Sequence, residues 1–547
     1  MRIFPEKGSY AGIFEVFIFS LLMSLPASYE PNHFAKVFFV TSFFHSLSWG
    51  IVLWVIASTK LRKLSAIALC SAFIFFIIET LCYLRFGSRL NPAVMTLIAQ
   101  TNAKEVLEFL QVFVFQPIML LPLAATVAAV FGYKIAKRRL VNKLVDFSNA
   151  IKIAVVITFI GGTVLPFLPF SFPIGNNTIM EFAKSVNFVR KNHNDIDKIR
   201  EAISKIEITS QPEIESAPTI VFVIGESFNK NHCELYGYGK NTCPNLSKEN
   251  SLGNLTVFDR AYSPTNSTAY AMKYIFTHTD CNPKTFNDSI YILMPAVFRK
   301  AGYKVNYFDN QYTQKLHGEW DYGCTYFLNP KDINDACFDF RNSEICHYDG
   351  DFISKYKSQF DLSPGSLNII HLMGMHADAK NRYPEGFGVF SEKDVDRYDL
   401  NKRERRRVAE YDNSVLYNDL VISNVISTLR DKNAIMLYIS DHGENIYDGE
   451  KPSYGRSFGN FANTNTQRDI YSIPFFIWCS NSFKRLNSEK YVRIQSAYNR
   501  LFCMADIPFL LYDIAGIDFN YNNRRKSLIS TDYVPHDIYL ERVFPIR

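Results

Sequence analysis

Five apolar runs dominate the first 170 residues of the chain, and they constrain its fold more than any other feature. They lie at 11–28, 37–57, 64–84, 111–132 and 151–170. An α-helix needs roughly 20 apolar residues to cross a bilayer, and each run is about that long. Five such runs in succession are typical of a membrane domain rather than of packed core helices, although the first could instead be a cleaved signal peptide. We therefore expect a transmembrane domain with five helices at 1–170.

Basic residues between the runs indicate how these helices are oriented. Lys60, Arg62 and Lys63 separate the second and third runs, and a larger basic cluster from Lys134 to Lys143 separates the fourth and fifth. Lysine and arginine in short loops stay on the cytoplasmic side, so an odd number of spans places the rest of the chain outside. The first 170 residues carry a net charge of +8 and the remainder −2. The overall charge of +6 therefore reflects orientation and gives no indication of nucleic-acid binding.

The outer connection between the third and fourth runs has a pattern of its own. Over 91–110, apolar residues recur at helical spacing among polar ones, for example at Val94, Leu97 and Ile98. This pattern predicts an interfacial helix near 91–110 that lies on the outer membrane surface. A plain connecting loop is the alternative.

Beyond the last apolar run the character of the chain changes. The stretch 171–217 is polar and contains Pro212, so we interpret it as a linker. From 218 to 547, helical patterns alternate with strand-like runs, which lie at 219–224, 303–308, 366–370, 434–440 and 472–478. Such alternation predicts a soluble α/β catalytic domain with a mostly parallel central sheet.

Eight of the ten cysteines lie in this outer part. An even number of cysteines in an oxidising compartment is typical of disulfides. Their spacing favours short staples within two clusters, one made of Cys233 and Cys243 and the other of Cys324, Cys337 and Cys346. Eight cysteines allow 105 pairings, so the connectivity stays open.

Three of the predicted strands end in residues that can bind a metal. Glu226 follows the first strand, His371 and His376 follow the third, and Asp441 and His442 follow the fourth. The carboxyl ends of parallel strands meet at one edge of a sheet, where such folds place their chemistry. Carboxylate and imidazole ligands suit Zn²⁺ and, as a second choice, Mn²⁺. The sequence therefore predicts a metal site at this edge.

A hydroxyl lies in a position to react at such a site. Thr268 stands near the start of a predicted helix, where backbone N–H groups and the helix dipole favour an anion. A hydroxyl bound to a divalent metal loses its proton readily and becomes a nucleophile. An ordinary helix cap is the alternative for Thr268 alone, and the neighbouring metal ligands favour the nucleophile.

These residues occur within an ordered set of motifs. The motifs read VIGES, HCELYGYGKNTCPNL, NSTAYAM, HLMGMH followed by RYP, and DHGE, after five apolar runs. The set resembles the membrane phosphoethanolamine transferases of Gram-negative bacteria, a branch of the alkaline phosphatase/sulfatase superfamily. The resemblance covers nearly the whole chain, and the ordered set is far more specific than any single motif.

The resemblance implies a function and a location. It implies a zinc ion held by Glu226, Thr268, Asp441 and His442, with Thr268 as the nucleophile. Thr268 would attack phosphatidylethanolamine and form a phosphoethanolamine–threonine intermediate, and lipopolysaccharide would then accept the group on a core sugar or on lipid A. The enzyme would be a multi-pass inner-membrane protein and a monomer, with residues 218–547 in the periplasm.

The resemblance also implies residues on the substrate side. These are His371, His376, Asp309, Asn310, Thr101 and Glu105. His376 would contact the transferred phosphate or a second zinc ion. Thr101 and Glu105 would approach the ethanolamine head group from the interfacial helix, where Leu97 replaces an asparagine that the family leads us to expect.

One departure from the family pattern concerns the acceptor. The lipid A-modifying members carry a further histidine after the DHGE motif, and this chain has none between His442 and residue 470. In that respect the chain is similar to the subgroup that modifies the lipopolysaccharide core. Lys451 or Arg456 could supply the missing positive charge beside a phosphate, or both could be solvated surface charges.

Three other functions compete with this interpretation. A phosphoglycerol transferase similar to the lipoteichoic-acid synthases has the same layout, but the cysteines of the outer part argue against it. A sulfatase needs a Cys or Ser in a C/S-x-P-x-R motif, which the Thr268 region lacks. An inactive envelope scaffold would be expected to lose metal ligands, and every predicted ligand is present.

Overall fold

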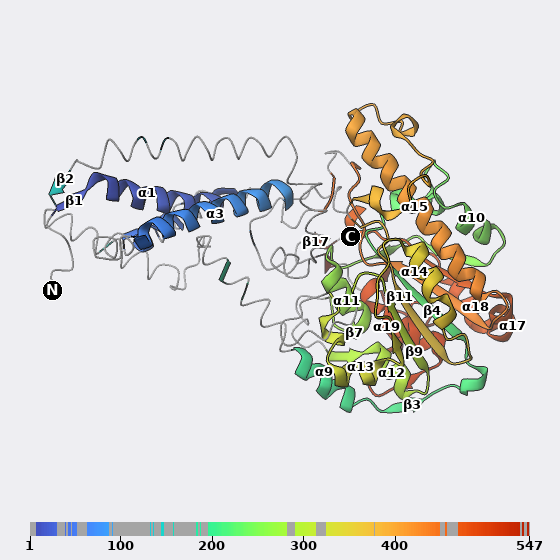
Figure 1. Ribbon diagram of the computed structural model, residues 1–547. Coiled ribbons are helices and arrows are strands. Elements are labelled where there is room, and N and C mark those ends of the chain that lie inside the picture. Colours follow the sequence, from blue (N-terminus) through green and yellow to red (C-terminus); the bar gives the residue numbers. More distant parts are fainter. Residues whose placement is uncertain are drawn as a thin grey trace. The chain divides into compact units, whose positions relative to one another are not determined.

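The computed structural model (Figure 1) describes two compact units, one drawn from the chain before residue 193 and one from the chain after it. The described residues are 7–29, 39, 42–44, 46–51, 63–86, 90, 132, 135, 144–146, 157, 182–183, 186, 195–281, 290–312, 324–376, 378–448, 454–456, 469–535, 539–540 and 544–545. Most of the predicted helices at 37–57, 111–132 and 151–170 and of the interfacial helix lie outside these residues. Thr101, Glu105 and Lys451 also lie outside them.

The first unit contains two helices that coincide with predicted ones. Helix α1 (Tyr10–Ser24) continues into the 3₁₀-helix η1 (Leu25–Tyr29), and α3 spans Lys63–Phe86. Phe19 and Met23 of α1 pack with Ala72 of α3 in a small buried cluster. Strand β1 (Lys7–Ser9) pairs antiparallel with β2 (Leu144–Asp146). Among the described residues, no helix combines the length and the apolar character needed to cross a membrane.

A seven-stranded sheet forms the centre of the second unit. Its order is β10 (Phe340–Arg341), β9 (Lys304–Asp309), β11 (Ser366–His371), β4 (Thr219–Gly225), β12 (Ala434–Ser440), β13 (Phe475–Cys479) and β5 (Leu255–Phe258). The first five strands are parallel, as predicted, but β13 runs antiparallel to both of its neighbours. The sheet is therefore mixed, and the prediction of a mostly parallel sheet is correct only in part. An apolar run indicates that a strand is buried but not in which direction it runs.

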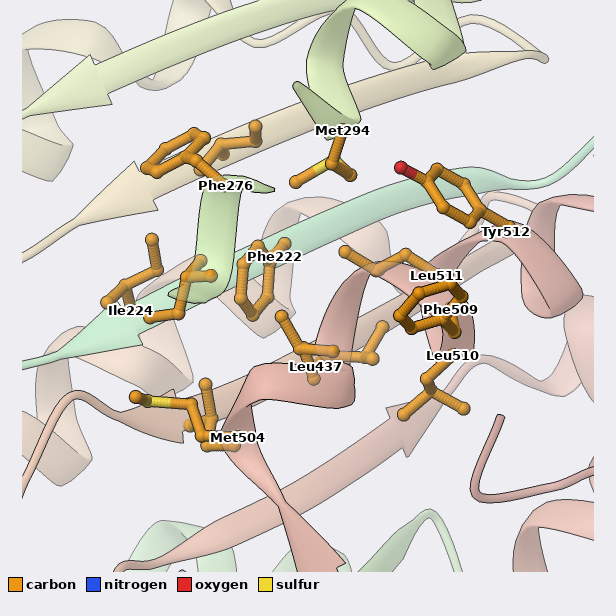
Figure 2. Close-up of a cluster of buried hydrophobic side chains, with 14 of the residues drawn as sticks. Phe222, Ile224, Phe276, Met294, Leu437, Met504, Phe509, Leu510, Leu511 and Tyr512 are labelled. Carbon is orange, nitrogen blue, oxygen red and sulfur yellow. The ribbon is translucent and has the colours of Figure 1, made fainter. Parts of the chain in front are cut away.

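Helices cover both faces of this sheet. One face carries α10 (Pro244–Ser251), α14 (Asp349–Tyr356) and α15 (Lys402–Leu429), and the other carries α11 (Thr268–Phe276), α12 (Met294–Lys300) and α19 (Ile507–Ala515). Strand β4 serves both faces by alternation, since Phe222 and Ile224 belong to one core and Val221 and Val223 to the other. Figure 2 shows Phe222 and Leu437 packed beside the apolar residues of α19. Burial on both faces explains why these strands read as continuous apolar runs.

Smaller elements complete the second unit. They are α9 (Asp195–Ser204), α13 (Lys331–Cys337), α17 (Asn481–Leu486), α18 (Ser488–Ser496), and the strand pairs β3 (Ile208–Ser210) with β15 (Asp518–Phe519), β6 (Ala261–Tyr262) with β14 (Phe502–Cys503), β7 (Thr277–His278) with β8 (Ile290–Leu293), and β16 (Tyr539–Leu540) with β17 (Phe544–Pro545). Ile199 of α9 is fully buried in the same core as Phe222. The described end of the predicted linker therefore packs on this unit.

The register of the parallel strands brings their carboxyl ends to one level. Ile224 lies opposite His371, which in turn lies opposite Asp309. Gly225 lies opposite Ser440. Residues that directly follow β4, β9, β11 and β12 therefore meet at one edge of the sheet, as the sequence predicts.

Candidate active site

Three predicted metal ligands lie together at this edge. Glu226 follows β4, and Asp441 and His442 follow β12. One ligand atom from each of the three lies within 4.8 Å of the others, and all three side chains are fully buried. Among the described residues, this is the group of three His, Cys, Asp or Glu side chains that could hold a metal ion.

Thr268 joins this cluster from the opposite direction. It is the first residue of α11, and its hydroxyl donates to Glu226 Oε2 at 3.0 Å. The hydroxyl oxygen of Thr268 also lies 3.3 Å from His442 Nε2. The helix cap is Ser267, so the Thr268 hydroxyl does not serve as an ordinary cap. The structure thus brings the predicted nucleophile into contact with two of the predicted ligands.

Hydrogen bonds and charge set the state of the two residues after β12. His442 Nδ1 lies 2.8 Å from the carbonyl oxygen of Gly443, and His442 Nε2 lies 3.0 Å from Asp441 Oδ2. Burial and the nearby Arg456 lower the pKa of His442, but Asp441 and Glu226 raise it more, so the net shift is upward. Burial alone would raise the pKa of Asp441, but His442 and Arg456 bring it down to about 2. Asp441 is therefore a carboxylate at neutral pH.

The residues of the cluster fit a zinc ion. Asp441 Oδ1 accepts hydrogen bonds from the backbone N–H groups of Ser227 and His442, at 3.0 and 2.7 Å. Asp441 Oδ2 is buried and accepts no hydrogen bond within the described part of the chain, although it lies 3.0 Å from His442 Nε2. A buried carboxylate oxygen without a donor is costly, and a metal ion would satisfy it. Two carboxylates, an imidazole and a hydroxyl are a suitable donor set for zinc.

Gln311 is a contact of the cluster that the sequence analysis missed. Its side-chain amide donates to Glu226 Oε2 at 3.1 Å and to the carbonyl oxygen of Leu372 at 2.9 Å. Gln311 therefore ties the Glu226 carboxylate to the turn after β11. An amide is not a typical zinc ligand, so its only signal in the sequence was its place two residues after β9.

Asp309 and His371 form a buried pair beside the cluster. Asp309 Oδ1 lies 3.0 Å from His371 Nδ1, and the Asp309 carboxylate also accepts the Tyr307 hydroxyl at 2.7 Å. Burial lowers the pKa of His371, but Asp309 raises it more, with smaller contributions from Glu226 and Asp441. His371 Nε2 is buried and finds no hydrogen-bond partner among the residues that the structure describes. Asp309 thus orients the ring of His371.

Asn310 contacts a different acidic residue. Its amide donates to Asp349 Oδ1 at 2.8 Å, and its side-chain oxygen accepts from the backbone N–H of Cys346 at 2.7 Å. Asp349, which the sequence analysis did not single out, accepts the backbone N–H groups of Met373 and Gly374 at 2.9 and 2.8 Å. Burial raises the pKa of Asp349. Asn310 and Asp349 together fix the turn that follows His371.

Two further predicted residues lie near the cluster. His376 ends the turn after β11, and burial lowers its pKa to about 3, so its ring is neutral. Arg456 donates to the carbonyl oxygen of Asn266 at 2.8 Å and also contacts His442 Nε2. The Arg456 side chain is only 9% exposed, so it is not a solvated surface charge. Arg456 is therefore a largely buried positive charge at this edge of the sheet.

The structure also tests which cysteines are neighbours. Cys233 Sγ and Cys243 Sγ lie 3.1 Å apart, so the two thiols are neighbours but are not bonded as the predicted disulfide requires. Cys281 Sγ and Cys503 Sγ lie 3.7 Å apart although 222 residues separate them, and the spacing of the sequence did not indicate this pair. Each of these cysteines is a thiol in the structure.

Comparison with known proteins places this geometry in a family. A model described as Sulfatase matches residues 218–505, which is more than half of the chain. The chain belongs to the sulfatase family. The match begins at the first strand of the sheet and includes Glu226, Thr268, Asp441 and His442.

Relatives within this family narrow the similarity. The phosphoethanolamine transferase EptC of Escherichia coli (strain K12) is 26% identical over 551 residues, which cover 95% of this chain and 87% of the relative. The crystal structure of the C-terminal periplasmic domain of EptC from Escherichia coli in complex with zinc is 25% identical, with a TM-score of 0.50, over 61% of this chain and 91% of that domain. The resemblance to the phosphoethanolamine transferases is confirmed.

Two other proteins extend the comparison. The Kdo(2)-lipid A phosphoethanolamine 7''-transferase of Escherichia coli (strain K12) is 27% identical over 274 residues, 48% of this chain and 45% of that enzyme. The integral membrane lipooligosaccharide phosphoethanolamine transferase A from Neisseria meningitidis is 17% identical, with a TM-score of 0.62, over 96% of this chain and 97% of that protein. The chain therefore shares the fold of this last protein over nearly its whole length.

Proposed function

We propose that this protein transfers phosphoethanolamine from phosphatidylethanolamine to lipopolysaccharide through a phosphoethanolamine–threonine intermediate. The observation that carries the proposal is the contact of the Thr268 hydroxyl with Glu226 and His442, beside Asp441. The relatives named phosphoethanolamine transferases support the group transferred, and the relative named for lipid A supports the class of acceptor.

The first half-reaction begins at Thr268. Its hydroxyl proton points at Glu226 Oε2, 3.0 Å away, so this carboxylate can take up the proton as Oγ1 attacks the phosphorus of the donor. The diacylglycerol oxygen takes up that proton as it leaves, and phosphoethanolamine stays on Thr268. A zinc ion held by Glu226, Thr268, Asp441 and His442 would supply positive charge for the nucleophile and for the phosphoryl oxygens.

The second half-reaction reuses the same groups. A hydroxyl of lipopolysaccharide, on a sugar or on a phosphate group, attacks the phosphorus and gives its proton to Glu226. Thr268 Oγ1 then leaves and takes up this proton. Arg456, which contacts His442, would pair with the phosphoryl oxygens through its guanidinium fork. His371 and His376 would contact the same phosphate, with Asp309 holding His371 in position. In this account Asn310 supports the site through Asp349.

The proposed location follows from the two parts of the chain. We place a transmembrane domain of five helices at 1–170, a linker at 171–217 and a periplasmic catalytic domain at 218–547. The basic clusters on either side of the predicted spans support this orientation, and so does the full-length fold similarity to an integral membrane protein. Thr101 and Glu105 would approach the donor head group from the interfacial helix.

Zinc is the proposed metal, and the chain is proposed to act as a monomer. The zinc complex of the EptC domain supports this choice over Mn²⁺. A second zinc ion could be bound at His376 during turnover. The absent histidine after the DHGE motif supports a core sugar as the acceptor position.

The other functions explain less of the site. Sulfate-ester hydrolysis by a sulfatase needs an oxidised Cys or Ser, whereas this cluster presents Thr268. An inactive scaffold would have no reason to keep a buried carboxylate oxygen such as Asp441 Oδ2, which lacks a hydrogen-bond partner within the described ranges. A phosphoglycerol donor is not indicated by the names of the relatives.

The variant Thr268→Ala tests the proposal. We expect at least 10³-fold slower transfer from a fluorescent phosphatidylethanolamine, because the variant lacks the nucleophile. Ser267→Ala is the matched control, since it removes a neighbouring hydroxyl and should retain activity within about threefold. Transfer by Thr268→Ala at the rate of the control would exclude Thr268 as nucleophile. Mass spectrometry of lipopolysaccharide from strains with and without the protein would show the acceptor position.

A further inference from the structure

Ser227 joins the two acidic residues of the site. It follows Glu226 directly at the end of β4 and is fully buried. Its backbone N–H donates to Asp441 Oδ1 at 3.0 Å, and its hydroxyl donates to Glu226 Oε1 at 2.6 Å. One residue therefore contacts carboxylates that follow two different strands.

The backbone of Ser227 has a conformation that residues other than glycine rarely adopt. Its φ angle is 57°, in the left-handed region. Tyr411 of α15 holds this conformation, because its hydroxyl donates to the carbonyl oxygen of Ser227 at 2.6 Å and accepts the backbone N–H of Asn229 at 2.7 Å. Backbone strain that neighbouring residues maintain in this way is found mainly at functional sites.

The backbone of Glu226 is held from the other side by the turn after β11. A Cβ atom at Gly374 would lie 2.7 Å from the carbonyl oxygen of Glu226 and 2.9 Å from its nitrogen, so only glycine fits there. The backbone N–H of Met375 also donates to the carbonyl oxygen of Glu226 at 3.0 Å. With its backbone fixed, Glu226 orients its carboxylate through side-chain hydrogen bonds alone.

These hydrogen bonds fix how each carboxylate is oriented. Asp441 Oδ1 accepts two backbone N–H groups, and Oδ2 has no such partner in the described ranges. Glu226 Oε1 accepts the Ser227 hydroxyl. Glu226 Oε2 accepts the Thr268 hydroxyl and the Gln311 amide. We propose that Ser227 is a positioning residue that orients both carboxylates for zinc and for Thr268. This inference rests on the proposed function, in which these residues hold zinc.

The variant Ser227→Ala removes the hydroxyl and keeps the backbone N–H. In the full-length protein we expect Zn²⁺ to bind about 10- to 100-fold more weakly, measured by competition with a chromophoric chelator. The visible absorption spectrum of the Co²⁺-substituted protein should also change, because the orientation of Glu226 changes. The melting temperature of the metal-free protein should stay within about 2 °C of wild type.

A matched control distinguishes this role from general packing. Ser366 is fully buried at the start of β11, and its hydroxyl donates to the carbonyl oxygen of Ser363 at 2.7 Å. Ser366→Ala should bind zinc as wild type does. Equal zinc affinity in Ser227→Ala and Ser366→Ala would overturn the inference and leave the proposed function intact. So would a lower melting temperature of metal-free Ser227→Ala, because partial unfolding would then explain its weaker zinc binding. A wild-type protein that binds no zinc would overturn the proposed metal site together with this inference.

Discussion

Two clusters in the second unit each combine one buried histidine with two acidic residues. The first is the active-site cluster of Glu226, Asp441 and His442. The second, which we call the His232 cluster, contains His232 with Asp412 of α15 and Asp448. By composition alone, either cluster could be a metal site.

The clusters differ in how fully their polar atoms are paired. His232 Nδ1 lies 2.7 Å from Asp412, and Nε2 lies 3.3 Å from Asp448. Lys240 pairs with Asp412 at 2.6 Å, and Asn229 donates to Asp448 at 2.7 Å. In the active-site cluster, by contrast, Asp441 Oδ2 accepts no hydrogen bond from a described residue and has only the ion-pair contact with His442 Nε2, at 3.0 Å.

A structural cluster and a reactive cluster therefore differ in whether their polar atoms are all paired. Burial lowers the pKa of His232, but its hydrogen bonds to Asp412 and Asp448 raise it to about 9. Both ring nitrogens of His232 lie against carboxylates, and Lys240 pairs with one of these, so the His232 cluster is a closed set of ion pairs. The active-site cluster combines a carboxylate oxygen that accepts no hydrogen bond with a threonine hydroxyl, which supports its proposed role as the site of reaction.

The largest expected effects come from changing one aspartate in each cluster. Asp441→Asn should abolish stoichiometric zinc binding and slow transfer at least 10³-fold, because it removes a ligand charge. Asp412→Asn should keep zinc but lower the free energy of unfolding by about 3 kcal/mol, because it leaves His232 and Lys240 without their shared carboxylate. Metal analysis and thermal melting of both variants measure the two effects.

This pair of variants can also show whether the roles of the two clusters are assigned correctly. The two assignments require opposite outcomes. Asp441→Asn should lose zinc and keep its melting temperature, whereas Asp412→Asn should keep zinc while folded and melt at a lower temperature. Zinc loss in Asp412→Asn at temperatures where it remains folded would show that the His232 cluster is part of the metal site.

The His232 cluster should make stability depend on pH. The folded-state pKa of about 9 exceeds the ordinary value of 6.5, so the stabilisation is complete below pH 6.5 and is lost as pH rises through 9. The loss should be on the order of 3 kcal/mol. His232→Gln should remove this dependence, and melting temperatures of wild type and variant between pH 6 and 10 measure it. Parallel profiles for the two proteins would contradict a charged His232.

A disulfide between Cys233 and Cys243 should stabilise the segment that follows His232. In the proposed periplasmic location, a disulfide oxidant would remove the two thiol hydrogens and close a short loop. Cys243→Ser should then lower stability by up to about 3 kcal/mol under oxidising conditions and have little effect after reduction. Zinc content should not change in either state. Alkylation of both wild-type thiols without reductant would contradict the staple.

The smallest expected effect concerns Arg456 on the active-site side. Its positive charge lies against His442, so Arg456→Ala should tighten zinc binding about tenfold, or about 1.4 kcal/mol, while slowing transfer. Arg456→Lys keeps the charge and should bind zinc as wild type does. Weaker zinc binding in Arg456→Ala would show that Arg456 supports the metal ligands rather than the substrate.

The predicted ligands could be found in the sequence because their signals are local. Glu226 and the pair Asp441 and His442 directly follow apolar runs, and Thr268 precedes a helical pattern. Strand ends at one edge of a sheet bring such residues together whatever the details of packing. This is why four residues from three distant segments could be assigned to one site.

The missed features depend on contacts that no local pattern encodes. Gln311 reaches Glu226 across 85 residues, and Ser227 acts through a left-handed backbone that Tyr411 maintains. Strand β13 was recognised as apolar, but its antiparallel direction depends on how the chain returns to the sheet. Arg456 was left open as a surface charge because a single sequence does not show burial.

The covalent intermediate provides the most direct test of the central claim, that Thr268 accepts phosphoethanolamine within the active-site cluster. The full-length protein would be incubated with phosphatidylethanolamine without acceptor and examined by intact-mass and peptide mass spectrometry. We expect one phosphoethanolamine on Thr268, absent from Thr268→Ala and released when lipopolysaccharide is added. Donor consumption by the wild-type protein with no adduct on Thr268 would contradict the account.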